Sequence, residues 1–386
     1  MNNDLSSYFE DPEFKEALEK YEGMVKNHTP AYFEADELTD IAEYYASKGR
    51  QIEAEAAIDF ALQLHPNDTD ALIFRARSLA MKGRLDEAYM VMDLIEDRSD
   101  REVRFLKADL LMEEKRMEEA DHVFEELAAY EEGKLETLID IILAYIDANQ
   151  EALAKKWIKH VGETYDLASL SQKNQKFRDL LCDFYITFNN PEAAIPLLQA
   201  TLDCYPYSIN HWNSLGKCYL STNDYEEAHE AIDFALAIDD SNAEALTLKA
   251  FCYQQSGELQ KSCDYYLRLA EQQENKTRAY LALAKTYFEM QDYTSSIYYI
   301  EALLDNKDAL SKYELSELYG DIALCHAALK HIGVGQASIR RSLELNENDP
   351  DTLIVAGRFF LMEAKACNDE TAKAENQAKG ELYFRQ

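Results

Sequence analysis

A 34-residue pattern in the middle of the chain constrains the fold more than any other feature of the sequence. In the segment 209–242, four residues have the spacing i, i+3, i+4 and i+7, which places them on one helix face: Trp212, Leu215, Gly216 and Tyr219. A second apolar pattern with helical spacing follows and begins at Ala228. Because Gly216 and Ala228 are small, two antiparallel helices could cross closely there. One such hairpin cannot bury its apolar face alone, so it needs neighbours.

Copies of the pattern occur on both sides of this segment. Successive copies are predicted to start near Ala35, Thr69, Arg101, Leu135, Gln175, Ile209, Ala243, Thr277 and Ser316. The copy from Leu135 departs from the pattern, because Ile142 replaces the small residue of its first helix. A longer connection follows it from Glu163 to Asn174, where we expect a kink or a boundary between two sub-arrays. An insertion from Asp305 to Leu315 lengthens the exit of the eighth copy.

The ends of the chain are interpreted as caps. Residues 1–10 form a lead, and Asp11-Pro12 predicts the start of a helix, with an N-cap followed by proline at the first helical position. The predicted organisation is therefore a lead and capping helix (1–34), repeats one to four (35–174), repeats five to nine (175–349), and a final helix pair with a C-terminal cap (350–386). A polar, solvent-facing end helix is what an open array requires for solubility.

The motif W-x2-L-G-x2-Y and its period resemble the tetratricopeptide repeat, and the copies stay in register over roughly residues 35–366. The resemblance implies an all-α fold, a right-handed α-solenoid (superhelix) of about nine helix–turn–helix repeats between N- and C-terminal capping helices. No strand-like alternation with hairpin turns competes with this assignment.

The charge of the chain restricts its partners. The formal net charge is −34, which disfavours nucleic acid and anionic membranes and favours basic partners, although a solvated acidic exterior without further meaning is the plainer interpretation. The N-terminus has no secretory pattern, and no apolar run is long enough to span a membrane. The seven cysteines include no C-x-x-C pair, so we expect free thiols and a cytoplasmic location.

A search for catalytic chemistry in the sequence finds none. The patterns H-E-x-x-H, G-x-x-x-x-G-K-[ST], G-x-G-x-x-G and G-x-S-x-G do not occur. Cys218 and Cys252 hold equivalent positions in successive repeats, but core packing explains them better than a metal site does. We therefore expect no enzyme activity, no cofactor and no metal.

In the tetratricopeptide-repeat family, the first helix of each repeat lines a concave groove. The resemblance therefore implies that a partner would contact the non-core positions of these helices, and we expect it to contact Phe105, Met112, Leu143, Ile146, Asn213, Lys217, Phe251, Gln254, Arg278, Leu281, Lys285 and Phe288. Phe105, Phe251 and Phe288 would be the anchors, unless they pack against the neighbouring repeat.

Three cations in this set come from adjacent repeats: Lys217, Arg278 and Lys285. They either receive a carboxylate of the partner or pair with nearby acids on the helix surface. The Lys and Asn pattern with which some family members clamp chaperone C-termini is not reproduced here, so we do not expect that ligand.

The sequence thus predicts a non-enzymatic scaffold that binds a partner peptide or helix in the groove. The alternatives are a self-assembling structural module and the sensor part of a regulatory complex. The identity of the partner, the oligomeric state, and whether the chain's own tail fills the groove remain open at this point.

Overall fold

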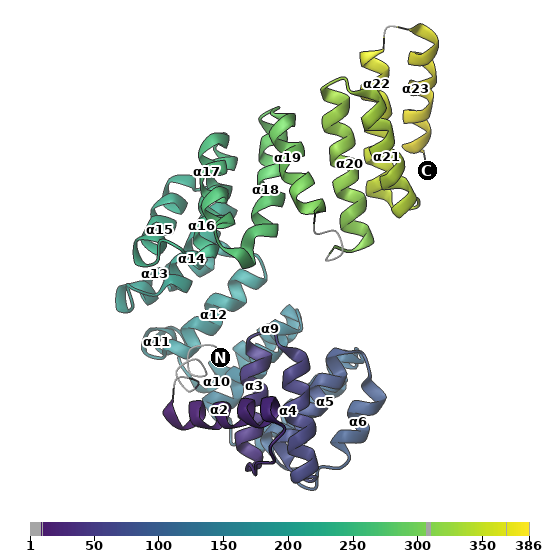
Figure 1. Ribbon diagram of the computed structural model, residues 1–386. Helices are drawn as coiled ribbons and strands as arrows, with labels where there is room; N and C mark the ends of the chain where they lie inside the picture. The colour runs from purple at the N-terminus through teal and green to yellow at the C-terminus, as the bar shows by residue number, and fades with distance from the viewer. Residues whose placement is uncertain (1–8, 10, 306–309, 368, 386) are drawn as a thin grey trace. The chain divides into compact units, whose positions relative to one another are not determined.

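The structure is a computed structural model of the 386-residue chain, and it describes residues 9, 11–305, 310–367 and 369–385. The described residues form helices joined by turns, with no strand among them (Figure 1). They divide into two compact units, Met1–Leu180 and Leu181–Gln386. Most of the predicted lead (1–8 and 10), part of the predicted insertion (306–309), and residues 368 and 386 of the tail lie outside the described residues.

The first unit contains an N-terminal helix, four helix hairpins and a short linking helix. The elements are α2 (Pro12–Asn27), α3 (Ala35–Ser47), α4 (Gln51–Leu64), α5 (Thr69–Met81), α6 (Leu85–Met92), α7 (Arg101–Glu113), α8 (Met117–Tyr130), α9 (Leu135–Asp147), α10 (Glu151–Thr164) and α11 (Leu167–Lys173). Asp11 caps α2 as predicted, because its side chain accepts a hydrogen bond from the Glu13 backbone N–H at 2.8 Å. The four predicted repeat starts coincide with the starts of α3, α5, α7 and α9.

The second unit begins within α12 (Gln175–Thr187) and continues the hairpin pattern. The remaining elements are α13 (Pro191–Cys204), α14 (Ile209–Thr222), α15 (Tyr225–Ile238), α16 (Ala243–Gln255), α17 (Leu259–Ala270), η1 (Gln273–Asn275), α18 (Lys276–Glu289), α19 (Tyr293–Leu304), α20 (Lys312–Ala328), α21 (Ile332–Leu345), α22 (Pro350–Ala366) and α23 (Glu370–Tyr383). α20 begins before the predicted start at Ser316, because Ser311 and Glu314 form a capping box.

The turns between the two helices of a hairpin repeat with the period of the sequence. Asn189, Asn223, Gly257 and Gln291 follow one another at intervals of 34 residues, and all have φ between 53° and 80°. A left-handed residue directly after a helix ends it by turning the chain back. Each first helix in these repeats therefore ends near an equivalent position of the repeat. The same kind of turn then leads into its antiparallel partner helix.

Close helix packing explains the small residues in the pattern. A Cβ on Gly216 would lie 2.8 Å from Cγ1 of Ile232 on α15, which is closer than real Cβ contacts come. Ala228 and Ile232 are fully buried on the α15 side of this crossing. The predicted all-α repeat fold is confirmed in the described residues, while the right-handed course of the whole array stays a prediction.

Candidate partner-binding surfaces

The predicted groove residues of the first unit lie inside the array. Phe105 is 7% exposed, Met112 and Ile146 are also buried, and Leu143 is half-buried. The ring centroid of Phe105 lies 5.3 Å from that of Phe124 on α8. The neighbouring first helices α5 and α7 pack side by side and cover positions that one hairpin alone would leave open. Phe105 thus packs within the array, which is the alternative that the sequence left open.

Two predicted groove residues of the second unit connect α14 to α16. Asn213 is 1% exposed, and its Nδ2 donates hydrogen bonds to Oδ1 of Asn242 and Oε2 of Glu244, both at 3.1 Å. Its Oδ1 has no hydrogen-bond donor in the described part of the chain. Lys217 is exposed and forms an ion pair with Glu244. These contacts hold two first helices together, so Lys217 is not a free cation.

The exposed apolar side chain on this face is Phe251 of α16, which is 42% exposed. Gln254, one turn further along the helix, is half-buried and donates a hydrogen bond to Glu289 of α18 at 2.8 Å. Phe251 therefore stands beside a polar link between two first helices.

The predicted residues on α18 show two kinds of environment. Arg278 and Lys285 are exposed, and no ion pair involves either of them in the described residues. They are seven residues apart, which is two helical turns or about 10.5 Å along the axis. Leu281 and Phe288 are half-buried, and the Phe288 ring lies 5.4 Å from that of Tyr293.

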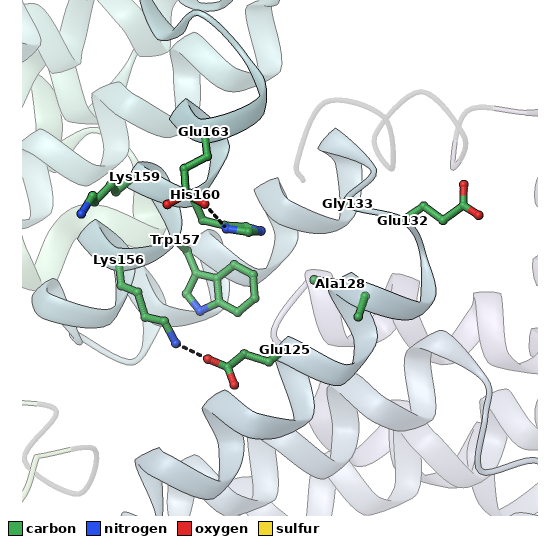
Figure 2. A pocket seen from close by; sticks show the side chains of 10 residues that line it. Glu125, Ala128, Glu132, Gly133, Lys156, Trp157, Lys159, His160 and Glu163 are labelled. Carbon is green, nitrogen blue, oxygen red and sulfur yellow. Dashed lines mark hydrogen bonds and ion pairs between the residues drawn. The ribbon is translucent and has the colours of Figure 1, made fainter.

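A cavity that the sequence did not predict lies between the second helices α8 and α10 of the first unit (Figure 2). It has a volume of about 490 Å³, and we call it the Trp157 pocket. Its lining residues are Glu125, Ala128, Ala129, Glu132, Gly133, Lys156, Trp157, Lys159, His160 and Glu163. The side chain of Trp157 is 3% exposed. Its orientation is fixed by a hydrogen bond that its Nε1 donates to Asp121 at 2.9 Å.

Several of the charges at the Trp157 pocket are satisfied within the chain. Lys156 pairs with Asp121 at 2.5 Å. It also pairs with Glu125 at 2.5 Å, and His160 lies 3.1 Å from Glu163 (Figure 2). Burial by itself would raise the pKa of the Asp121 carboxyl, but hydrogen bonds from the groups around it outweigh burial and lower this pKa. Those donors are Lys156, Trp157 and Tyr145. This network belongs to the scaffold.

A second cavity of about 490 Å³ lies in the second unit, between α13, α14 and α15. We call it the Trp212 pocket, and its lining residues are Gln199, Leu202, Asp203, Pro206, Trp212, Leu215, Tyr219, Glu227, Glu230, Ala231 and Phe234. The indole of Trp212 stacks on the ring of Phe234 with a centroid distance of 4.5 Å and an interplanar angle of 17°. Its Nε1 donates a hydrogen bond to the Pro206 carbonyl at 2.8 Å.

The rim of the Trp212 pocket differs in charge from that of the first pocket. Asp203, Glu227 and Glu230 are exposed, and none of them forms an ion pair with another described residue. No cation lines this cavity. Phe234 is 54% exposed although it takes part in the aromatic stack. The pocket therefore combines an apolar floor with an uncompensated negative rim.

Sequence reasoning missed both pockets because it followed only the first helices. One signal was available: the chain has two tryptophans, and each of them lines one of these cavities. The sequence pattern predicts Trp212 to lie in the repeat core, whereas the structure leaves it half-buried.

The described residues contain no group of three or more His, Cys, Asp or Glu side chains that could hold a metal ion. Burial raises the pKa of the thiols of Cys218, Cys263 and Cys325 to about 11, which makes these sulfurs poor nucleophiles. No helix in the described ranges has both the length and the apolar character needed to cross a membrane.

Comparisons with known proteins give one family match and several similar proteins. A family model described as "Tetratricopeptide repeat" matches residues 39–89 and 213–277. The formate-dependent nitrite reductase complex subunit NrfG of Escherichia coli O157:H7 is 26% identical over 191 residues, which cover 48% of this chain and 89% of that relative. Among solved structures, the type IV pilus biogenesis factor PilW has a TM-score of 0.43 at 16% identity and covers 55% of this chain and 94% of its own. The MamA protein has a TM-score of 0.40 at 19% identity, and the match covers 46% of this chain and 93% of MamA.

The repeated hairpins and the two matched segments together define the class. In the segments 39–89 and 213–277, the chain matches the tetratricopeptide-repeat family and is similar to its members. The repeated helix hairpins described above form a fold that suggests a scaffold for protein–protein interactions.

Proposed function

We propose that the chain is a non-enzymatic scaffold that binds a segment of a partner protein on the first-helix face of α14, α16 and α18. The observation that carries this proposal is the exposure of Phe251 on that face. Aromatic side chains dominate the energetics of many interfaces, and an exposed ring on a rigid helix can bind with little loss of conformational freedom.

The exposed cations of α18 suggest the chemistry of the partner segment. Arg278 and Lys285 are exposed cations of α18, and no ion pair with a described residue occupies them. A carboxylate of the partner would form a charge-assisted hydrogen bond with either cation. The segment we propose therefore carries an apolar side chain and an acidic one.

Two further observations bear on the role and the location of the chain. The relative NrfG is described as a subunit of a complex, which agrees with a protein that acts by contact with others. The seven cysteines are free thiols, so we place the chain in a reducing compartment, the cytoplasm.

The test is affinity capture from an extract of the source organism with the full chain as bait. We compare wild type with Phe251→Ala and with Leu267→Ala, a matched control because Leu267 on α17 is 39% exposed. We expect Phe251→Ala to lose a specific protein, with affinity at least ~10-fold weaker, while Leu267→Ala retains it. Retention of every bound protein by both variants would show that this face is not the site.

Light scattering across a range of concentrations separates this proposal from self-assembly. A monomer at all concentrations agrees with a scaffold for other proteins. A dimer that Phe251→Ala dissociates would instead make this face a self-association surface.

A further inference from the structure

The Trp212 pocket combines a cavity of about 490 Å³ with an accessible aromatic ring and an unpaired acidic rim. Its floor is apolar, because Leu202, Leu215 and Ala231 are buried beneath the opening. Phe234 stands at the edge with more than half of its surface accessible. Covering such a ring and filling the cavity would remove apolar area from water, which is the usual source of binding free energy.

The three rim carboxylates define the charge that the pocket accepts. Asp203 comes from α13, whereas Glu227 and Glu230 come from α15, so acids face the cavity from two helices. No cation of the described chain pairs with them. In a chain of net charge −34, a basic ligand also gains from the field of the whole molecule.

The aromatic stack selects the same charge. The faces of Trp and Phe rings attract cations, and the aliphatic stem of a lysine or arginine packs well on them. Phe234 presents such a surface beside the carboxylates. An anionic ligand would meet repulsion from the rim and from the rings alike.

We infer that the Trp212 pocket is a second docking site, which binds a segment of a partner protein carrying a lysine or arginine next to an apolar residue. The apolar side chain enters the cavity over Leu215, and the cation lies between Phe234 and the rim carboxylates. This site is formed by α13, α14 and α15. It therefore does not depend on Phe251 or on the cations of α18.

The test uses a synthetic peptide of roughly 14 residues with blocked ends, which places Lys and Leu at helical spacing. Its dissociation constant is measured by calorimetry with the full chain. The pocket variant combines Asp203→Asn, Glu227→Gln and Glu230→Gln. The control variant combines Asp264→Asn, Glu271→Gln and Glu274→Gln, which removes the same charge from exposed residues that do not line the pocket.

We expect the pocket variant to bind the peptide about 10-fold more weakly and the control variant to stay within about twofold of wild type. Phe234→Ala keeps all three rim carboxylates and should also weaken binding, and circular dichroism checks that each variant is folded. Equal weakening in the two triple variants would overturn the inference, because the peptide would then respond only to net charge. An unchanged affinity in the pocket variant would overturn it as well.

A second copy of this chain is the competing occupant. If light scattering shows a dimer that the pocket variant dissociates, the pocket is a self-association surface and the inference is wrong. Failure of the Phe251→Ala capture experiment leaves the peptide result unaffected, so the two proposals are tested separately.

Discussion

The two tryptophan pockets have the same volume and different character. In the first unit, Trp157 is buried, its N–H is bound to Asp121, and Lys156 balances the nearby acids. In the second unit, Trp212 stacks on the half-exposed Phe234, and the carboxylates around the cavity have no cation. The difference shows that cavity volume alone does not identify a binding site. What distinguishes the two is whether the chain satisfies its own polar groups.

The sharpest way to test this contrast is to remove each tryptophan in turn. Trp157→Ala should lower the free energy of unfolding by about 3–5 kcal/mol, because it empties a buried site and removes one of the three hydrogen-bond donors to Asp121. Trp212→Ala should cost about 2 kcal/mol, because that side chain is only half-buried. Urea unfolding followed by circular dichroism measures both values, and equal costs would remove the distinction between the pockets.

A smaller effect should follow from Asp121→Asn, which keeps the shape of the side chain but not its charge. Near pH 7 we expect a loss of about 1–3 kcal/mol. Because the folded-state pKa of Asp121 is lowered, its contribution is present above the unfolded pKa of about 4 and is lost as pH falls through the folded value. Unfolding curves at several pH values should therefore converge for wild type and variant in acid. A gap that persists there would show that the charge is not the cause.

Asp321 of the second unit should affect the pH dependence of stability in the opposite direction, because its pKa is raised and not lowered. Burial raises the pKa of Asp321 on α20 to about 6, although Lys285 and Arg358 act against that rise. A raised folded-state pKa stabilises the chain below the unfolded pKa, and this stabilisation is lost as pH rises through about 6.

Asp321→Asn should accordingly raise the free energy of unfolding near pH 7 by about 1–2 kcal/mol, with the gain disappearing near pH 4. The measurement is the urea midpoint at both pH values. A variant less stable than wild type near pH 7 would mean that Lys285 and Arg358 hold the charged form more strongly than burial opposes it.

The smallest effect on stability is expected at the rim of the Trp212 pocket. The triple variant of Asp203, Glu227 and Glu230 should change the free energy of unfolding by no more than about 0.5 kcal/mol, because these exposed acids have no partner to lose. The matched triple variant of Asp264, Glu271 and Glu274 provides the reference. A large loss in the pocket variant alone would make these carboxylates part of the scaffold.

Local patterns explain how far the sequence predicts the fold. The helices that start at Ala35, Thr69 and Ile209 are predicted from apolar periodicity and from small residues. Both signals reflect contacts within a single hairpin, so they can be detected in the sequence. The early start of α20 was missed although its capping box, Ser311 with Glu314, is visible in the sequence. α11 was also missed, because a short helix without buried residues leaves no apolar period to detect.

The candidate sites were harder to predict, because they depend on contacts between hairpins. Phe105 and Asn213 occupy open positions on an isolated first helix, yet the adjacent first helix or the partner helix covers them. Phe251 occupies a comparable position and remains exposed. The Trp212 pocket depends on the spacing of α13 and α15, which no residue pattern within one repeat encodes.

The contrast between the pockets can be measured directly, because the chain has only two tryptophans and each one reports on its own cavity. Trp157→Phe leaves Trp212 as the fluorophore, and Trp212→Phe leaves Trp157. On titration with the Lys/Leu peptide, our account predicts a saturable shift of emission in the Trp157→Phe variant and none in the other. A shift at Trp157, or a peptide that binds without any shift at Trp212, would contradict it.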